Sequence, residues 1–165
     1  MNKTVCFTGH REISDAIHRI LAKKLHLAVE SQILSGATTF RTGGALGFDT
    51  MAALCVLSMK SKHPHIRLEL FLPYPEQAEH WSKNTRTIYE QILQRADEHR
   101  YICPHYFHGA LQIRNRALVA GADVCIAYLE SSQDGGTAYT SALALQNGLE
   151  WINLYDELQN ANKKI

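Results

Sequence analysis

Short apolar segments alternate with longer segments of helical periodicity along all 165 residues. Strands are expected at residues 4–7, 38–41, 66–72, 100–103, 123–129 and 151–154, and helices at about 14–35, 50–62, 76–95, 110–120 and 138–146. A helix between two strands normally forms a right-handed crossover that leaves the strands parallel. The alternation therefore predicts an α/β, Rossmann-like, doubly wound fold: a mostly parallel sheet of about six strands with helices on both faces.

The length and composition are those of one globular domain, which we expect over residues 1–155, followed by a polar C-terminal tail at 156–165. Seventeen basic and sixteen acidic residues give a nearly neutral chain, which makes a nucleic-acid partner unlikely on electrostatic grounds. No apolar run approaches the roughly 18 residues of a membrane span, and the four cysteines contain no CxxC pair. We expect a cytoplasmic protein with reduced thiols and no membrane contact.

A glycine-rich stretch over residues 42–49 joins the second expected strand to the second helix. Gly43, Gly44 and Gly47 would let the backbone approach a ligand, and the first amides of the helix would face an anion. Asp49 could either cap those amides or accept a ribose hydroxyl. The stretch is typical of a phosphate-binding loop, although a glycine-rich turn of this kind is often purely structural.

Other polar turns follow the remaining strands. Thr8-Gly9-His10-Arg11 follows the first strand, Pro73-Tyr74-Pro75 the third, and Asp134-Gly135-Gly136-Thr137 the fifth. Parallel strands end at the same edge of a sheet, and ligands of such folds bind there, where the strand order reverses. The sequence therefore predicts one ligand site assembled from these turns.

Three of these segments resemble known families. Residues 42–49 with Met51-Ala52-Ala53 are similar to a segment of the DNA-processing protein DprA, although Ala53 stands where that family has histidine. Arg114-Asn115-Arg116 followed by Ala122-Asp123 resembles segments of DprA and of the Lonely Guy phosphoribohydrolases, and residues 135–138 resemble their glycine-threonine turn. On these segments the chain is identified as a member of the SLOG superfamily, and its size and its 73–81 segment are most similar to the YpsA-like branch.

The resemblance implies a pocket for a nucleotide or nucleotide-derived ligand, whose phosphate would lie on the amides of the Gly43 and Gly135 turns. Arg11 and Arg114 would supply positive charge, because a guanidinium can bind two phosphate oxygens. Either arginine could instead form an ordinary ion pair. Thr137 could bind phosphate, cap its helix, or do both.

Four further side chains are candidates for the remainder of such a ligand. Asn115 could recognise a base or ribose edge, or cap its helix, and His10 could contact the ligand from the end of the first strand. Tyr74 and Trp81 could stack on a base, and packing is the more common role for a residue such as Trp81. The nine histidines include no pair with a well-placed third ligand, so no metal site is expected.

The resemblance does not determine activity. The Lonely Guy enzymes carry a glutamate directly after their glycine turn, whereas Thr137 is followed by Ala138. Asp49, Asp134 or Glu130 could substitute for it by position. Our leading hypothesis is that the protein binds a nucleotide-like ligand as a sensor or carrier. We also expect the protein to form a homodimer. The alternatives are an enzyme that cleaves a nucleoside monophosphate and a single-stranded DNA binder.

Overall fold

The computed structural model describes residues 2–130 and 135–163 and contains one six-stranded, all-parallel sheet of order β4-β3-β2-β1-β5-β6. This confirms the predicted doubly wound fold. The strands are β1 (Lys3–Gly9), β2 (Ala37–Thr42), β3 (Arg67–Leu72), β4 (Glu98–Tyr101), β5 (Val124–Tyr128) and β6 (Glu150–Asn153). The helices are α1 (Asp15–Leu34), α2 (Phe48–Met59), α3 (Lys83–Arg95), α4 (Ala110–Val119), α5 (Gly136–Gln146) and α6 (Leu154–Asn162).

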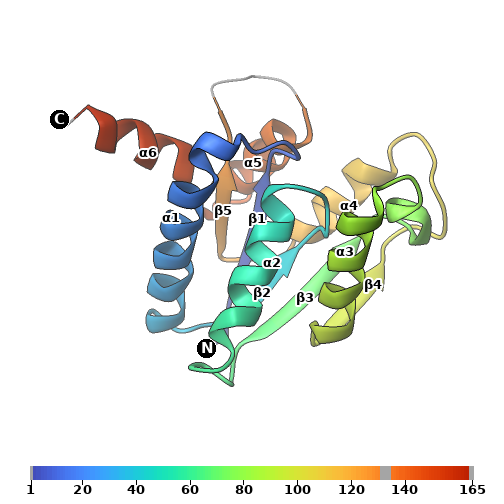
Figure 1. Cartoon of the computed structure of the whole chain (residues 1–165), viewed down its shortest axis with the longest axis horizontal. Helices are drawn as coiled ribbons and strands as arrows, with labels where there is room; N and C mark the ends of the chain where they lie inside the picture. The colour runs from blue at the N-terminus through green and yellow to red at the C-terminus, as the bar shows by residue number, and fades with distance from the viewer. Residues whose placement is uncertain (1, 131–134, 164–165) are drawn as a thin grey trace.

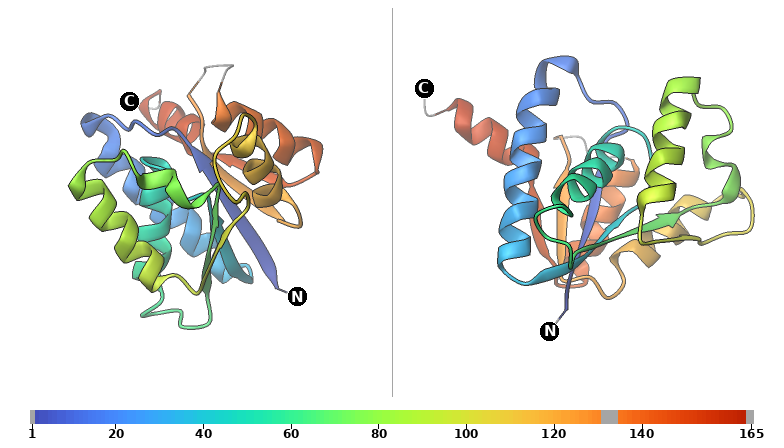
Figure 2. Two further views of the ribbon diagram at one scale, coloured as in Figure 1. Left: turned by 90° about the vertical axis from the view of Figure 1, so that its right-hand side faces the viewer. Right: turned by 60° about the horizontal axis from the view of Figure 1, so that its bottom comes forward.

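The helices form two layers around the sheet (Figures 1 and 2). Helices α1, α2 and α3 cover one face, and α4 and α5 cover the other. The strands run upward in Figure 1, so the loops that follow them gather at the top of that view. No helix among residues 2–130 and 135–163 is long and apolar enough to cross a membrane.

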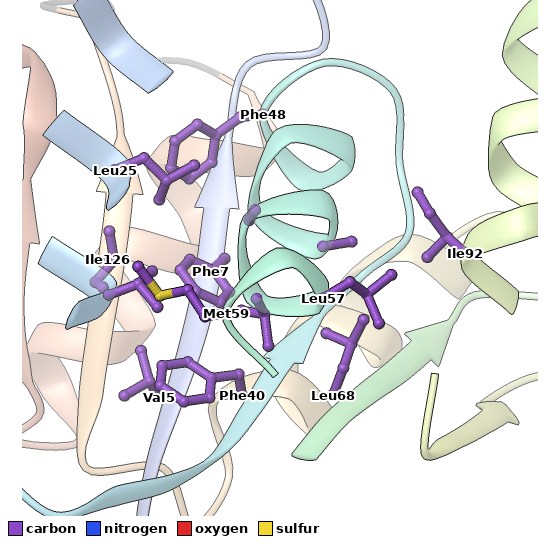
Figure 3. Packing of buried hydrophobic residues seen from close by; sticks show 14 of the residues in the cluster. Val5, Phe7, Leu25, Phe40, Phe48, Leu57, Met59, Leu68, Ile92 and Ile126 are labelled. Carbon is purple, nitrogen blue, oxygen red and sulfur yellow. The ribbon is translucent and has the colours of Figure 1, made fainter. Parts of the chain in front are cut away.

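The largest part of the core lies between the sheet and helix α2 (Figure 3). The ring of Phe7 on β1 stacks on Phe40 of β2, with ring centroids 6.1 Å apart, and meets the edge of Phe48 at 6.5 Å. All three rings are fully buried. Because Phe48 is the first residue of α2, this packing fixes the start of that helix above the end of β1.

The loop after β1 crosses directly over the loop before α2. The amide of Phe48 donates a hydrogen bond of 3.0 Å to the carbonyl of His10. Gly47 has a φ of +74°, and a Cβ at this position would overlap the backbone carbonyl of Arg11. A Cβ on Gly9 would likewise overlap the ring of Phe48. Both glycines are needed because two segments of the protein's own backbone meet here.

The single helix predicted over residues 76–95 is wrong, because two separate elements occupy this stretch. Pro75–Ala78 forms a short 3-10 helix, and α3 begins only at Lys83. Ser82 breaks the run because its hydroxyl accepts a hydrogen bond from the amide of Thr85 at 3.3 Å, which makes it a helix N-cap. Trp81, just before the cap, packs against Tyr89 with ring centroids 5.2 Å apart.

The C-terminal segment also differs from the polar tail expected at 156–165. Helix α6 runs from Leu154 to Asn162 and buries Leu154 and Leu158. Its cap is Asn153, whose side-chain oxygen accepts hydrogen bonds from the amides of Leu129 (3.0 Å) and Tyr155 (3.3 Å). A few buried leucines in a mainly polar run were too weak a periodic signal to predict this helix.

Replacing Gly47 with alanine should destabilise the fold far more than replacing Gly148. Gly148 has nearly the same φ, +73°, but a Cβ at this position would have no other atom within 4 Å. We expect Gly148→Ala to cost about 1 kcal/mol through its backbone conformation and Gly47→Ala about 2 kcal/mol more through overlap with Arg11. Urea denaturation of both variants measures the difference, and equal losses would contradict the close contact.

Candidate functional site

A polar cavity lies at the carboxyl ends of β1 and β5, where the strand order reverses. The chain leaves β1 toward β2 on one side, and it leaves β5 toward β6 on the other. Such a switch point opens a crevice between the two departing loops. The cavity has a volume of about 360 Å³ and is lined by Phe7, Thr8, Gly9, His10, Arg11, Ala45, Asp49, Leu111, Arg114, Asn115, Leu118, Gly136 and Thr137.

Arg114 forms the floor of this cavity and is only 5% exposed. Its Nη1 donates hydrogen bonds to the carbonyls of Gly43 at 2.6 Å and Phe71 at 3.4 Å, and its Nε donates to Asn115 Oδ1 at 2.9 Å. Burial lowers the pKa of Arg114, and the nearby Asp49 carboxylate opposes that shift. The guanidinium therefore ties α4 to the ends of β2 and β3.

Asp49, in the first turn of α2, is the buried acidic group whose charge acts on Arg114. Its Oδ2 accepts a hydrogen bond of 3.1 Å from the amide of Ala45, within the glycine-rich loop. Burial raises the pKa of Asp49, while Arg114 and the Ala45 amide act in the opposite direction. Asp49 therefore binds an amide of the glycine-rich loop and does not cap the first amides of α2, whose N-cap, Gly47, has no side-chain cap hydrogen bond. A carboxylate of the protein itself lies at the loop amide that was predicted to face phosphate.

The glycines of the loop pack against protein groups. A Cβ on Gly43 would overlap the Arg114 guanidinium and reach 3.0 Å from Asp49 Oδ2. Gly44, with a φ of +66°, lies against Leu72, and its carbonyl accepts a hydrogen bond of 3.1 Å from Gln77 Nε2. Gln77 is thus a residue that fixes the loop and that sequence reasoning did not single out. The loop is a rigid wall of the site rather than an open cradle.

Asn115 provides an unused hydrogen-bond donor at the cavity wall. Its side chain is 8% exposed, and its Oδ1 accepts from Arg114 Nε, which turns the amide nitrogen Nδ2 away from the arginine. Nδ2 has no hydrogen-bond partner among the described residues, and it lies 3.8 Å from the position of a Cβ on Gly136. Thr137, the second residue of α5, is also buried and lines the same cavity.

His10 and Arg11 form the opposite side. The amide of Glu130 donates to His10 Nε2 at 3.0 Å, and the imidazole meets the edge of Tyr128 at a centroid distance of 5.8 Å. Arg11 is exposed, and its side chain has no hydrogen bond or ion pair within the described ranges. The cavity therefore carries one solvent-exposed cation at its rim and one fixed, buried cation at its floor.

Several candidates do not line this cavity, and the loop glycines Gly43, Gly44 and Gly47 are among them. Tyr74 is not among the residues that line the cavity; it packs edge-on against Tyr106, with ring centroids 5.4 Å apart. Asp134 lies outside the described residues, and Gly135 precedes α5 without lining the cavity. Thr8 and Leu111 also line the cavity, from β1 and α4. The sequence placed Thr8 in the turn after the first strand without giving it a role, and it missed Leu111, which belongs to no motif.

A doubly wound parallel sheet with a polar cavity at its switch point defines a Rossmann-like fold. The family model for YpsA, described as the YspA SLOG family, matches residues 5–156. The chain therefore belongs to this family, which confirms the resemblance seen in the sequence. A UPF0398 protein of Halalkalibacterium halodurans is 30% identical over 154 residues, which cover 81% of this chain and 82% of that protein.

Solved structures share the fold at lower identity. DNA processing protein A (DprA) from Streptococcus pneumoniae superposes with a TM-score of 0.66 at 17% identity, over 91% of this chain but only 49% of that chain. The molybdenum cofactor binding protein from Rippkaea orientalis superposes with a TM-score of 0.54 at 20% identity, over 98% of this chain and 84% of that chain. These similarities establish the fold.

Replacing Arg114 should destabilise the whole protein. Arg114→Met leaves Asp49 buried without its cation, and we expect the free energy of unfolding to fall by about 3–5 kcal/mol. Adding Asp49→Asn to Arg114→Met should cost less than the sum of the single changes, because the pair is coupled. Urea denaturation of the four proteins gives the coupling energy.

Arg116→Met is the matched control on the same helix. Arg116 is exposed, and within the described part of the chain its Nη1 donates only to the hydroxyl of Tyr139, at 3.2 Å. Its replacement should change the free energy of unfolding by less than about 0.5 kcal/mol. Additive effects of Arg114→Met and Asp49→Asn would mean that the two buried groups do not interact.

Proposed function

We propose that this protein binds a nucleotide or nucleotide-derived ligand in the switch-point cavity, as a sensor or carrier. The observation that carries the proposal is the Asn115 amide, whose Nδ2 donor faces the cavity and has no partner among the described residues. This donor is not among the buried unpaired side-chain atoms, so it is accessible from the cavity, and a ligand acceptor could bind it without breaking a protein hydrogen bond. The hydrogen bond from Arg114 fixes the orientation of this donor before any ligand arrives.

The phosphate of such a ligand fits best between Arg11 and the start of α5. Arg11 is a cation without a protein partner among the described residues, and the first amides of an α-helix attract anions. The Gly43 loop is less suited than the sequence suggested, because Asp49 already accepts from its Ala45 amide. Phosphate at the rim would leave Asn115 to read an acceptor on the base or sugar.

The size of the cavity supports a small ligand. Its volume of about 360 Å³ lies near the lower end of the range of about 300–1,000 Å³ for ligand pockets. A mononucleotide or a similarly small derivative fits this space better than an extended dinucleotide. The apolar walls contributed by Phe7, Leu111 and Leu118 would cover the apolar faces of a base.

A hydrolytic role is the second candidate. Cleavage of an N-glycosidic bond needs a carboxylate near the ribose. Asp49 is the only carboxylate among the described residues that line the cavity, and its Oδ2 already accepts from the Ala45 amide. Release of free base from nucleoside monophosphates, followed by chromatography, tests this role. Loss of the release in Asp49→Asn, in protein that remains folded, would assign the reaction to the cavity.

Ligand binding should depend on Arg11 without any effect on stability. In a thermal-shift screen against AMP, ADP-ribose, NAD, ATP, cyclic nucleotides and a pterin, a ligand at about 100 times its dissociation constant should add about 2.7 kcal/mol. Arg11→Ala should weaken its binding by about 1.5–3 kcal/mol, the usual contribution of a charge-assisted hydrogen bond.

Arg95→Ala is the control, because Arg95 is also exposed but lies in the last turn of α3. It should leave the ligand-induced shift unchanged. A ligand-induced shift that survives Arg11→Ala would exclude Arg11 from the site. The absence of a shift with every compound would contradict the nucleotide class.

Asn115→Asp tests the donor itself. Aspartate keeps an oxygen for Arg114 Nε but replaces the Nδ2 donor with a second, charged acceptor. We expect affinity for the ligand found in the screen to fall at least about tenfold, which corresponds to about 1.4 kcal/mol, while the protein stays folded. Isothermal titration calorimetry on the two proteins gives the ratio, and equal affinities would overturn the assignment of Asn115.

A further inference from the structure

Helix α1 carries three large apolar side chains that no other part of the described chain covers. Ile20, Leu27 and Leu34 are 53%, 60% and 77% exposed. They are spaced seven positions apart, which is about 20° short of two full turns, so they form one stripe along about 21 Å of the helix. Figures 1 and 2 show α1 at the outer edge of its layer, beside α6.

Two charged side chains lie beside this stripe. Lys23 precedes Leu27 by four positions and Glu30 follows it by three, so both lie on the same side of the stripe. Neither takes part in an ion pair within residues 2–130 and 135–163. The stripe therefore combines an uncovered apolar surface with two unpaired charges of opposite sign.

The stripe is complementary to itself when two copies run antiparallel. A two-fold axis at Leu27 would place Leu27 against Leu27 of the second copy and Ile20 against Leu34. The same axis would bring Lys23 opposite Glu30 of the second copy, so that the charges also pair. A parallel arrangement would instead place these two flanks on opposite sides of the interface, where the charges could not pair. Interfaces of two-fold dimers require this kind of self-complementary surface.

We propose that the protein forms a two-fold homodimer through antiparallel packing of α1 along residues 20–34. The stripe on α1 is covered by a second copy of this chain, because Lys23 and Glu30 of the two copies pair in the antiparallel orientation. A different apolar surface, the groove of about 550 Å³ between α1, α2 and α3, includes Leu54 and Ile88 but shows no such charge pattern. That groove is the competing interface.

Sedimentation velocity over a range of concentrations tests the proposal. The wild-type protein should have twice the mass of one chain, and Leu27→Glu should be monomeric, because two carboxylates would meet on the axis. Leu145→Glu is the control: Leu145 is 56% exposed but lies on α5, in the other helix layer. This variant should remain dimeric. A monomeric wild type, or dissociation by Leu54→Glu but not by Leu27→Glu, would overturn the proposal.

Charge reversal distinguishes the orientation. Lys23→Glu and Glu30→Lys should each weaken association, and the double variant should restore it, because the opposite charges again face each other. In a parallel dimer the two positions would not meet, so the single variants would have no defect for the double variant to repair. Unchanged association in both single variants, or a double variant no better than either, would contradict the antiparallel arrangement.

A cysteine on the axis gives an independent readout. Under mild oxidation, Leu27→Cys should form a disulfide-linked dimer, whereas Leu145→Cys and the wild-type protein should not. The background is low because Cys6, Cys103 and Cys125 are buried and Cys55 is half-buried. Equal cross-linking of Leu27→Cys and Leu145→Cys would show that Leu27 does not meet its counterpart.

Discussion

The hydrogen bonds of two buried charged side chains, Asp49 and Arg114, are the interactions on which the rest of the site depends. They connect the first turn of α2, the glycine-rich loop, the end of β3 and helix α4. Burial shifts the pKa of each group toward its neutral form, and the charge of the other group opposes that shift. Their main effect is geometric, because each hydrogen bond holds one part of the loop, the sheet or the helix in place.

In the proposed binding role, that arrangement would make the cavity specific despite its small size. The guanidinium uses Nη1 to hold the loop and Nε to orient Asn115, so one side chain sets both a wall and a donor. A ligand that binds here meets groups already in place and does not need to order them. Freedom of side-chain movement is confined to the rim, where the exposed Arg11 has no protein partner among the described residues.

The sequence predicted the fold well because strand and helix periodicities are local signals. The cap at Ser14 and the end of α1 near Gly36 could be placed to within a residue, since Ser14 accepts from the Ala16 amide and Gly36 has a φ of +97°. The roles within the site were harder. Gly43 and Gly47 indicate that something approaches the backbone closely, but they do not say whether that is a ligand or, as here, Arg114 and the loop after β1. The sequence predicted that Tyr74 lies in the turn after the third strand. It could not predict the contact of Tyr74 with Tyr106, because Tyr106 belongs to a segment distant in the sequence.

The two edges of the sheet differ in how much room their turns have. At the edge where the strands begin, Gly36, Gly121 and Gly148 all have open space around them. At the opposite edge, Gly9, Gly43 and Gly47 are enclosed by other parts of the protein, and Gly135 is the open exception among the described turns. A fluorophore or an affinity tag attached at the first edge would therefore sit a full strand length from the cavity and leave its walls untouched. Labels can therefore be attached at the turns that precede the strands without disturbing the cavity.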